Sequence, residues 1–423
     1  MRIVKIDNQI EAVKILKKID VDPYGVAAMA PKTRQLNVML TGQPCRTANI
    51  LKQEMLSLGA DAAVARGSVA CSIDRTDVLL MGTLKQLRAL PDKIKKQPFG
   101  LDVIAQELQT LLGNIEPNRR IFKTSRREIV LGEKTLIMGV LNITPDSFSD
   151  GNLYFETDRA IEHALRMQQE GADIIDIGAA SSRPGAEPVT AAEEIDRLLP
   201  VLDGLQDSLS VPVSVDTTKA QVAKASLSAG AEIVNDISAL NNDGEMAAIV
   251  AAAGAGLILM HMRGTPRTMQ TGDLVYADLM GEIIDYLKSS LEKARLAGIE
   301  AKRIAVDPGI GFGKTFADNC KIIGRLCELK TLGLPLLIGT SRKAFIGAVT
   351  DSAPDGRLEG TAATVAASIY GAYDKLWKRS VEEPEGTAAT VAASIYGGCD
   401  IVRVHDVAVM KKVAVMTDAI VRA

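Results

Sequence analysis

The sequence predicts an α/β protein in which a (β/α)8 barrel follows a smaller α/β domain. Two observations support this prediction. Eight short apolar runs alternate with helical segments from about residue 121 onward, which is typical of parallel strands buried on both faces. All eight runs end in polar residues, as barrel strands do where they form a site. We therefore expect residues 1–118 to form the first domain and residues 119–423 to form the barrel.

The composition narrows the class of protein. The 423 residues are 47% hydrophobic and 4% aromatic, and the formal net charge is −3. A general nucleic-acid binder would carry a basic patch or stacking aromatics, so we expect no nucleic-acid partner. The N-terminus has no continuous apolar stretch and no run of about 18 apolar residues occurs, so we expect neither a signal peptide nor a membrane span. These features favour a cytoplasmic protein that acts on small molecules.

The cysteines predict neither a disulfide framework nor a zinc site. Their number is odd and none forms a CxxC pair; they are Cys45, Cys71, Cys320, Cys327 and Cys399. We therefore expect reduced thiols in a cytosolic protein.

The N-terminal domain is expected to contain strands at Leu36–Leu40 and Asp77–Met81. Helical spacing of apolar residues covers Thr47–Leu58 and Leu101–Leu112. The polar stretch Gly113–Arg120 is a candidate linker. No catalytic constellation is recognisable in this domain.

The predicted barrel strands follow in order along the rest of the chain. They are Leu136–Leu141, Ala172–Ile177, Val211–Val215, Glu232–Val234, Gly256–Met260, Ile304–Val306, Leu334–Ile338 and Ile401–Val404. A doubly wound sheet is the alternative, but it would normally use fewer strands and a Gly-rich first turn. Here the first turn is Asn142-Ile143-Thr144-Pro145. We expect residues 121–134 to form a hairpin that closes the floor of the barrel.

An internal duplication interrupts the last part of this pattern. The thirteen residues at 359–371 are repeated at 385–397, between the seventh and eighth strands. A barrel needs one helix there, and two copies are too few to form a solenoid. We expect the second copy to fill the helix position, because Gly397 and Gly398 make a short exit into the eighth strand. The first copy would then be an outer or interface helix.

The residue types at the strand ends suggest a ligand. Asp216, Asn235 and Asp307 offer acceptors, which suit the N–H groups of a flat nitrogen heterocycle, and Lys343 adds a donor. Arg403 and His405 follow in the region where barrels often bind phosphate. Each residue alone could be a helix cap or a structural hydrogen-bonding group. Their occurrence at every strand end favours a functional site.

A metal would fit near the first strand. Asn142 supplies one hard oxygen ligand, and Mg²⁺ is commonly held by few protein ligands, with phosphate oxygens and waters completing the octahedron. A His-rich zinc site is disfavoured, since the chain has only three histidines. A serine nucleophile is disfavoured by the lack of a GxSxG elbow.

Residues 121–423 closely resemble dihydropteroate synthase. The motifs that carry the resemblance are Met138–Gly151, Asp176-Ile177-Gly178, Ser182-Arg183-Pro184-Gly185, Ser214–Thr217, Val234–Ile237, Met260-His261-Met262, Asp307–Lys314, Ser341-Arg342-Lys343 and Arg403–Val407. The resemblance implies a TIM barrel that joins p-aminobenzoate to 6-hydroxymethyl-7,8-dihydropterin diphosphate in folate biosynthesis. It also implies Mg²⁺ as cofactor and a homodimer.

The resemblance also implies roles for single residues. The pterin pocket would comprise Asp176, Asp216, Asn235, Asp307 and Lys343, and the diphosphate and magnesium contacts would be Asn142, Arg403 and His405. The aminobenzoate side would comprise Phe148, Ser182, Arg183 and Pro184. Arg403, His405 and Lys343 would be the catalytic residues. Many relatives have Glu-Ser-Thr-Arg-Pro where this chain has Ala180-Ser181-Ser182-Arg183-Pro184; serine keeps the hydroxyl group, so we expect function to be retained.

Two other functions fit a barrel with a pterin pocket. A folate–corrinoid methyltransferase would share the pocket but would not need the diphosphate contacts Asn142, Arg403 and His405. A binding protein without turnover would result if the duplication distorted the eighth strand. The intact Arg403-Val404-His405-Asp406 segment argues against this second alternative.

Overall fold

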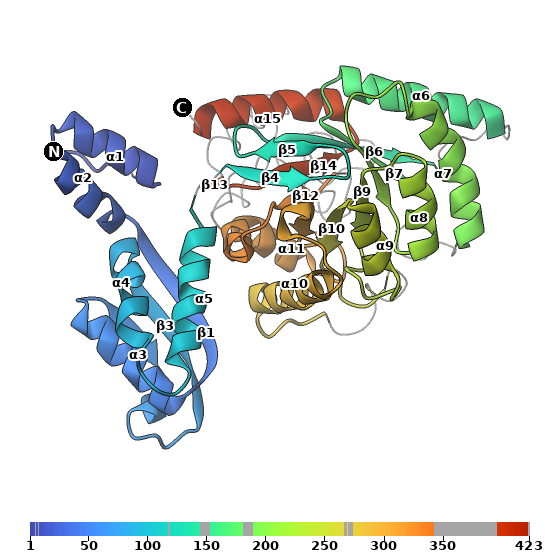
Figure 1. Cartoon of the computed structure of the whole chain (residues 1–423). Helices are drawn as coiled ribbons and strands as arrows, with labels where there is room; N and C mark the ends of the chain where they lie inside the picture. The colour runs from blue at the N-terminus through green and yellow to red at the C-terminus, as the bar shows by residue number, and fades with distance from the viewer. Residues whose placement is uncertain are drawn as a thin grey trace. The chain divides into compact units, whose positions relative to one another are not determined.

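The computed structural model describes residues 1–4, 6, 8–116, 119–143, 153–180, 189–265, 269, 274–341 and 396–421. The chain forms two compact units, Met1–Glu116 and Pro117–Ala423. Figure 1 colours the chain continuously from blue at the N-terminus to red at the C-terminus. The sequence placed the boundary between residues 118 and 119. Both copies of the duplication lie outside the described residues except for Tyr396–Gly397, which forms the short strand β13.

The first unit is an α/β unit built on a three-stranded antiparallel sheet with the order β1-β3-β2. Its elements are α1 (Gln9–Lys18), α2 (Pro23–Met29), η1 (Ala30–Lys32), β1 (Gln35–Pro44), α3 (Cys45–Ser57), β2 (Asp61–Val64), η2 (Arg66–Ser68), β3 (Arg75–Thr83), α4 (Leu84–Ile94) and α5 (Leu101–Asn114). Its core is formed by apolar side chains of the sheet, α3, α4 and α5, such as Leu51, Leu80, Leu87 and Leu108.

The linker predicted at Gly113–Arg120 is shorter in the structure. Gly113 and Asn114 continue α5, and Arg120 already begins the strand β4. The helix extends this far because Leu112 is buried in the core of the unit and Ile115 packs against that core. Apolar contacts here outweigh the weak helix propensity of a single glycine.

The prediction that all cysteines are reduced thiols is wrong for one pair. Cys45 and Cys71 form a disulfide, with their Cα atoms 5.6 Å apart. Cys45 begins α3 and Cys71 lies in the loop before β3, so the fold of the unit brings the two residues together. The sequence alone gave no spacing signal for this pairing. Cys320, Cys327 and Cys399 are free.

The second unit confirms the barrel. Its eight parallel strands lie in the order β11-β10-β9-β8-β7-β6-β14-β12. They are β6 (Leu136–Asn142), β7 (Ile174–Gly178), β8 (Val213–Asp216), β9 (Ile233–Asp236), β10 (Gly256–Met260), β11 (Ile304–Asp307), β12 (Leu337–Gly339) and β14 (Ile401–Val404). A single parallel bridge between Val306 and Leu336 joins β11 to β12 and closes the ring.

Helices surround this ring of strands, as Figure 1 shows for α7 to α10. They are α6 (Leu153–Gln169), α7 (Ala191–Leu205), α8 (Ala220–Ser228), α9 (Met246–Ala253), α10 (Leu279–Leu296), η4 (Ala301–Arg303), α11 (Phe316–Gly324), η5 (Leu326–Leu332) and α15 (Val407–Val421). Their apolar faces pack on the outward side chains of the strands in one large core. No helix within the described ranges is both long and apolar enough to span a membrane.

The hairpin predicted at residues 121–134 closes the floor of the barrel. It consists of β4 (Arg120–Lys123) and β5 (Glu128–Leu131). Phe122 and Leu131 are fully buried and pack against inward side chains of the strands, such as Met138 and Ile258. Thr124 also donates a hydrogen bond of 2.6 Å to the buried carboxylate of Glu232, just before β9. The apolar floor leaves the opposite end of the barrel as the place for polar chemistry.

Candidate active site

The inward face of the barrel changes from apolar to polar along the strands. Near the floor it presents side chains such as Met138, Ile174, Ile233, Ile258 and Ile401. Side chains two positions further along a strand lie on the same face. That alternation places Asp176, Asn235 and Arg403 inside, one layer higher. Register then adds Ser214 beside Asp176 and Asp216 beside Asn235.

Arg403 is the centre of this polar layer. Its Nε donates to Oδ2 of Asp176 at 2.6 Å, and its Nη2 donates to Oδ2 of Asp216 at 2.9 Å. Asn235 also donates to Oδ2 of Asp176, at 3.1 Å. Four of the predicted site residues, from strands β7, β8, β9 and β14, therefore form one connected hydrogen-bond network.

Two buried atoms in this layer have no hydrogen-bond partner. They are Oδ1 of Asp176 and Oγ of Ser214, and the two residues are register partners on β7 and β8. Buried polar atoms are usually paired, so an exception calls for an explanation such as a water or a ligand. Asp176 was predicted as a site residue, whereas Ser214 was named only as part of the motif Ser214–Thr217. A serine at an inward position of an otherwise apolar strand was the available signal.

The carboxyl of Asp216 is electrostatically unusual. Burial raises its pKa to about 7; Arg403 opposes the shift, and the neighbouring Asp176 adds to it. One guanidinium thus serves two carboxylates that are largely removed from water. A buried acid whose pKa is raised close to neutral is a frequent property of functional sites.

Asp307 ends β11 and begins a glycine-rich loop. Its Oδ1 accepts a hydrogen bond of 2.7 Å from the backbone N–H of Gly309. Gly309, Gly311 and Gly313 have φ values of 70°, 82° and 66°, in the left-handed region that favours glycine. A Cβ at Gly309 would lie 1.9 Å from the carbonyl oxygen of His261, so this glycine is required by close contact as well.

Lys314 supports the same loop from within. Its Nζ donates to the carbonyl oxygens of Gly309 at 2.9 Å and Phe312 at 3.0 Å, and lies 2.8 Å from Nδ1 of His261. The ammonium group can only donate, so Nδ1 of His261 must be the acceptor and the ring proton must lie on Nε2. Lys314 and His261 are both buried, which makes this a structural connection between the loops after β10 and β11.

His261 is held as a neutral ring. Burial lowers its pKa to about 2, and the positive charge of Lys314 adds to the effect. The ring also lies edge-on to Tyr286, with centroids 4.8 Å apart. Tyr286 donates to the carbonyl oxygen of Ser238 at 3.1 Å, so the network reaches the loop after β9. His261 therefore supports the mouth of the barrel rather than exchanging protons in it.

His405 and Asn142 lie at the ends of the neighbouring strands β14 and β6. The Oγ of Ser341 accepts from the backbone N–H of His405 at 3.2 Å and lies 3.0 Å from Nδ1 of its ring. Asn142 is exposed, and a Cβ at Gly178 would lie 3.8 Å from its Oδ1. No group of three or more His, Cys, Asp or Glu that could hold a metal occurs in the part of the chain that the structure describes.

Several predicted site residues cannot be located. Phe148, Ser182, Arg183, Pro184 and Lys343 lie outside the described residues, so their roles stay predictions. The structure brings together Asp176, Asp216, Asn235 and Arg403. His405 is the first residue after the end of β14.

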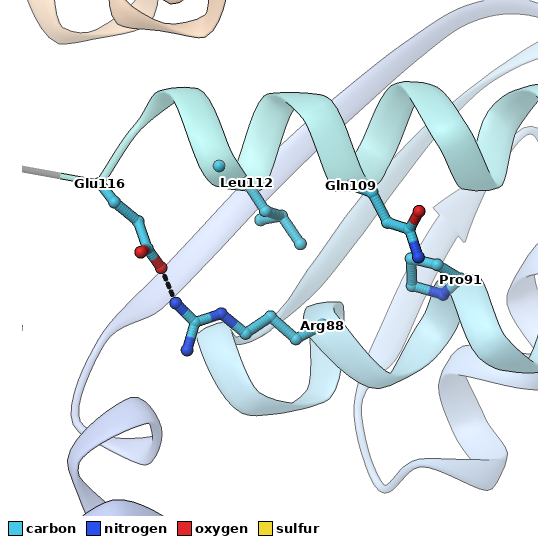
Figure 2. Close-up of a pocket in the computed structure, with 6 residues that line it drawn as sticks. Arg88, Pro91, Gln109, Leu112 and Glu116 are labelled. Atoms are coloured by element: carbon cyan, nitrogen blue, oxygen red, sulfur yellow. Dashed lines mark ion pairs between the residues drawn. The ribbon is translucent and has the colours of Figure 1, made fainter. Parts of the chain in front are cut away.

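The N-terminal unit has a separate hollow of about 270 Å³. Its lining residues come from α4, from α5 and from the segment just after α5. They are Arg88, Pro91, Gln109, Leu112, Gly113 and Glu116. Figure 2 shows Arg88 reaching from α4 towards Glu116, with which it forms an ion pair. The two charges satisfy each other, and the lining includes no nucleophile or metal-ligand cluster.

The barrel matches a known family and a solved structure. Residues 138–376 match the family described as pterin binding enzyme. The dihydropteroate synthase of Synechocystis is 44% identical over 293 residues, which cover 69% of this chain and 92% of that protein. The structure of the Xanthomonas albilineans dihydropteroate synthase with 4-aminobenzoic acid is 34% identical, with a TM-score of 0.61, and covers 72% of this chain and 98% of that one.

A third relative extends further along the chain. A probable bifunctional folylpolyglutamate synthase/dihydropteroate synthase of Halobacterium salinarum is 38% identical over 403 residues. The match covers 95% of this chain but 45% of that protein. A match of this length must continue into Met1–Glu116.

Proposed function

Because this chain belongs to the pterin binding enzyme family, and within it to the dihydropteroate synthases, we propose how its barrel carries out their reaction. The reaction condenses p-aminobenzoate with 6-hydroxymethyl-7,8-dihydropterin diphosphate, giving 7,8-dihydropteroate and pyrophosphate. A C–N bond forms at the methylene group of the pterin while the bond to the diphosphate oxygen breaks. The observation that supports the assignment of residues is the network of Asp176, Asp216, Asn235 and Arg403 inside the polar end of the barrel.

The acceptors at the ends of β8, β9 and β11 would bind the pterin. Asp216, Asn235 and Asp307 lie around one rim and offer carboxylate and amide oxygens to the N–H groups of the aminopyrimidine edge. Asn235 and Asp307 are buried, and Asp216 is half-buried. Water is therefore largely removed from these acceptors, which strengthens hydrogen bonds to a bound ring. Lys343 would add a donor to the pterin ring.

His405 and Asn142 would act at the other end of the substrate, on the diphosphate. The hydroxyl of Ser341 accepts from the His405 backbone, so its own proton can be donated to Nδ1 of the ring. Nε2 then carries the ring proton and can donate to an anionic oxygen. Stabilising the departing pyrophosphate is the main electrostatic task in this reaction. Arg403 adds positive charge to the same region.

Magnesium fits the donors at this rim. Asn142 offers an exposed amide oxygen, and Gly178 beside it has no side chain to obstruct the amide. One protein oxygen, together with phosphate oxygens and waters, is a common way to hold Mg²⁺. When bound, the ion would neutralise charge that develops on the leaving diphosphate.

No general base is needed for the nucleophile. The aromatic amine of p-aminobenzoate is already unprotonated near neutral pH, and His261, the one buried histidine of the site, is held neutral and turned towards Lys314. Phe148, Ser182, Arg183 and Pro184 would contact the aminobenzoate. We further propose a cytoplasmic homodimer. The Cys45–Cys71 disulfide is unusual for that compartment, so the location requires a direct test by cell fractionation.

A pyrophosphate-release assay tests the function directly. The full chain would be incubated with the pterin diphosphate, p-aminobenzoate and magnesium, and pyrophosphate would be measured. Release that needs both organic substrates is the expected result, and no release with all components present would refute the function. Release that continues in excess chelator would refute only the magnesium assignment. Size-exclusion chromatography with light scattering would decide between monomer and dimer.

A further inference from the structure

We propose that Arg403 changes partners when the pterin binds, and that Asp176 is the positioning residue that receives it. In the structure the guanidinium bridges Asp176 and Asp216. When Asp216 accepts the N–H groups of the pterin, Nη2 of Arg403 would move from Asp216 to the second oxygen of Asp176. The inference rests on the proposed pterin site and assigns to Asp176 a role other than contact with substrate.

The two carboxylate oxygens of Asp176 accept unequal numbers of hydrogen bonds. Its Oδ2 accepts from both Arg403 and Asn235, at 2.6 and 3.1 Å. Its Oδ1 is buried and has no hydrogen-bond partner. The side chain itself is fully buried. A buried oxygen without a partner is unfavourable, and here it is an acceptor that can receive a second hydrogen bond from Arg403.

Arg403 and the bound pterin would compete for the carboxyl of Asp216. Its Oδ2 is 2.9 Å from Nη2 of Arg403, and the ligand also needs the oxygens of this carboxyl. Burial raises the pKa of Asp216 although Arg403 opposes the shift, so further donors to this carboxylate would offset its removal from water. A ring that brings its own N–H donors would meet that need and make the contact with Arg403 dispensable.

The planar guanidinium of Arg403 has a shape that allows two of its donors to pair with a single carboxylate. Nε–H and one Nη2–H point in the same direction, and a carboxylate can accept both in parallel. Nε already lies on Oδ2 of Asp176. Rotation of the guanidinium about that contact would carry Nη2 from Asp216 to Oδ1 of Asp176. Arg403 would then be held by one carboxylate instead of two. Asp176 alone would set the orientation of the guanidinium and of its remaining Nη1 donors.

A ligand complex tests the exchange without any substitution. Binding of 6-hydroxymethylpterin to the wild-type full chain would first be measured by calorimetry, and the complex would then be crystallised. We expect Nη2 of Arg403 within hydrogen-bond distance of Oδ1 of Asp176 and no longer within reach of Asp216. Absence of binding would contradict the proposed function itself. Binding with Arg403 still on Asp216, or with Arg403 on neither carboxylate, would overturn only the exchange.

A double-mutant cycle gives an independent test in solution. Asp176→Asn should lower kcat/KM for the pterin diphosphate by about tenfold or more, the usual effect of losing a charge-assisted hydrogen bond. If Asp176 acts through Arg403, the same substitution in an Arg403→Gln background should change kcat/KM by less than about threefold, because coupled residues are non-additive. Equal effects in both backgrounds would overturn the proposal.

The control variant is Asp173→Asn. This residue precedes β7 at the opposite end of the same strand, where it pairs with Lys134 and Lys411. The change is again carboxylate to amide, but it lies far along the strand from the pocket. It should lower thermal stability while leaving kcat/KM within about twofold of wild type, as expected for independent sites. Circular dichroism would show that Asp176→Asn is folded, and the wild-type complex decides the question if it is not.

Discussion

The Nζ of Lys314 lies 2.8 Å from Nδ1 of His261, and both side chains are buried between two loops of the barrel mouth. This contact fixes the protonation state of the histidine, since the ammonium can only donate. It also connects the glycine-rich loop after Asp307 to the strand that precedes it in the ring. Lys314 and His261 therefore belong to the support of the site.

His261 should make the protein less stable in acid. Its pKa is lowered to about 2 in the folded state, whereas an unfolded histidine titrates near 6.5. Below pH 6.5 the unfolded chain binds a proton that the native ring does not, so the free energy of unfolding should fall by up to about 1.4 kcal/mol per pH unit. Urea denaturation between pH 5 and 7 should show a shallower pH dependence for His261→Gln, if folded. An equal pH dependence of the free energy of unfolding in wild type and His261→Gln would contradict this account.

Lys314→Met should disturb the loop more than the strands. The substitution keeps the length of the side chain but leaves Nδ1 of His261 and the carbonyl oxygens of Gly309 and Phe312 without this donor. We expect a loss of about 2–4 kcal/mol in stability from unpaired buried acceptors and a raised KM for the pterin diphosphate, because Asp307 lies at the start of this loop. Lys321→Met, on the helix α11 that follows, is the control and should leave KM unchanged.

Pterin binding should weaken as the pH falls through about 7, the value to which the pKa of the Asp216 carboxyl is raised. Above this pH the group is a carboxylate that can accept at both oxygens; below it, the group is a neutral acid with less acceptor capacity. Calorimetry with 6-hydroxymethylpterin between pH 5.5 and 8 would measure the slope. Asp216→Asn should bind more weakly and without this pH dependence; an unchanged slope would assign the titration to another group.

Ser341→Ala should lower turnover while leaving pterin affinity nearly unchanged. The hydroxyl lies 3.0 Å from Nδ1 of His405 and accepts from its backbone N–H. Without it, neither the orientation nor the tautomer of the ring is fixed, and we expect kcat to fall by about fivefold to tenfold, the usual effect of losing one neutral hydrogen bond. Steady-state kinetics would separate kcat from KM. An equal change in both would place Ser341 in substrate binding instead.

Reducing agent should destabilise the N-terminal unit alone. The disulfide joins residues separated by 26 positions, and closing a loop of this size contributes about 3 kcal/mol. Differential scanning calorimetry of the full chain with and without dithiothreitol should shift one transition and leave the barrel transition in place. Cys45→Ser should mimic reduction. A shift of the barrel transition, or no shift at all, would contradict the assignment.

The sequence predicted the barrel well because its signal is repeated and local. Each strand is a short apolar run, and each ends close to where the polar residue begins. The hairpin floor followed from the same pattern, since Phe122 and Leu131 are apolar residues in a segment of their own. The acceptors Asp216, Asn235 and Asp307 were recognised from their position at strand ends alone.

The partners of these residues were not predictable in the same way. Arg403 and Asp176 are 227 positions apart, and Lys314 and His261 are 53 apart. Their contacts depend on the register of the strands and on which side chains face inward. A shift of one residue in the register would turn the inward side chains outward and break these contacts. The pairing of Cys45 with Cys71 was missed for a similar reason, because it arises from the packing of α3 against a loop.

The single bridge between β11 and β12 gives the barrel an uneven rim. Val306 and Leu336 make the one ladder contact there, whereas β10 and β11 share a register of four pairs. Segments with few backbone hydrogen bonds open locally at lower free energy than the rest of a fold. Asp307 stands at the end of β11, on this seam. The wall of the pocket that carries Asp307 is therefore anchored on its β10 side and weakly paired on its β12 side.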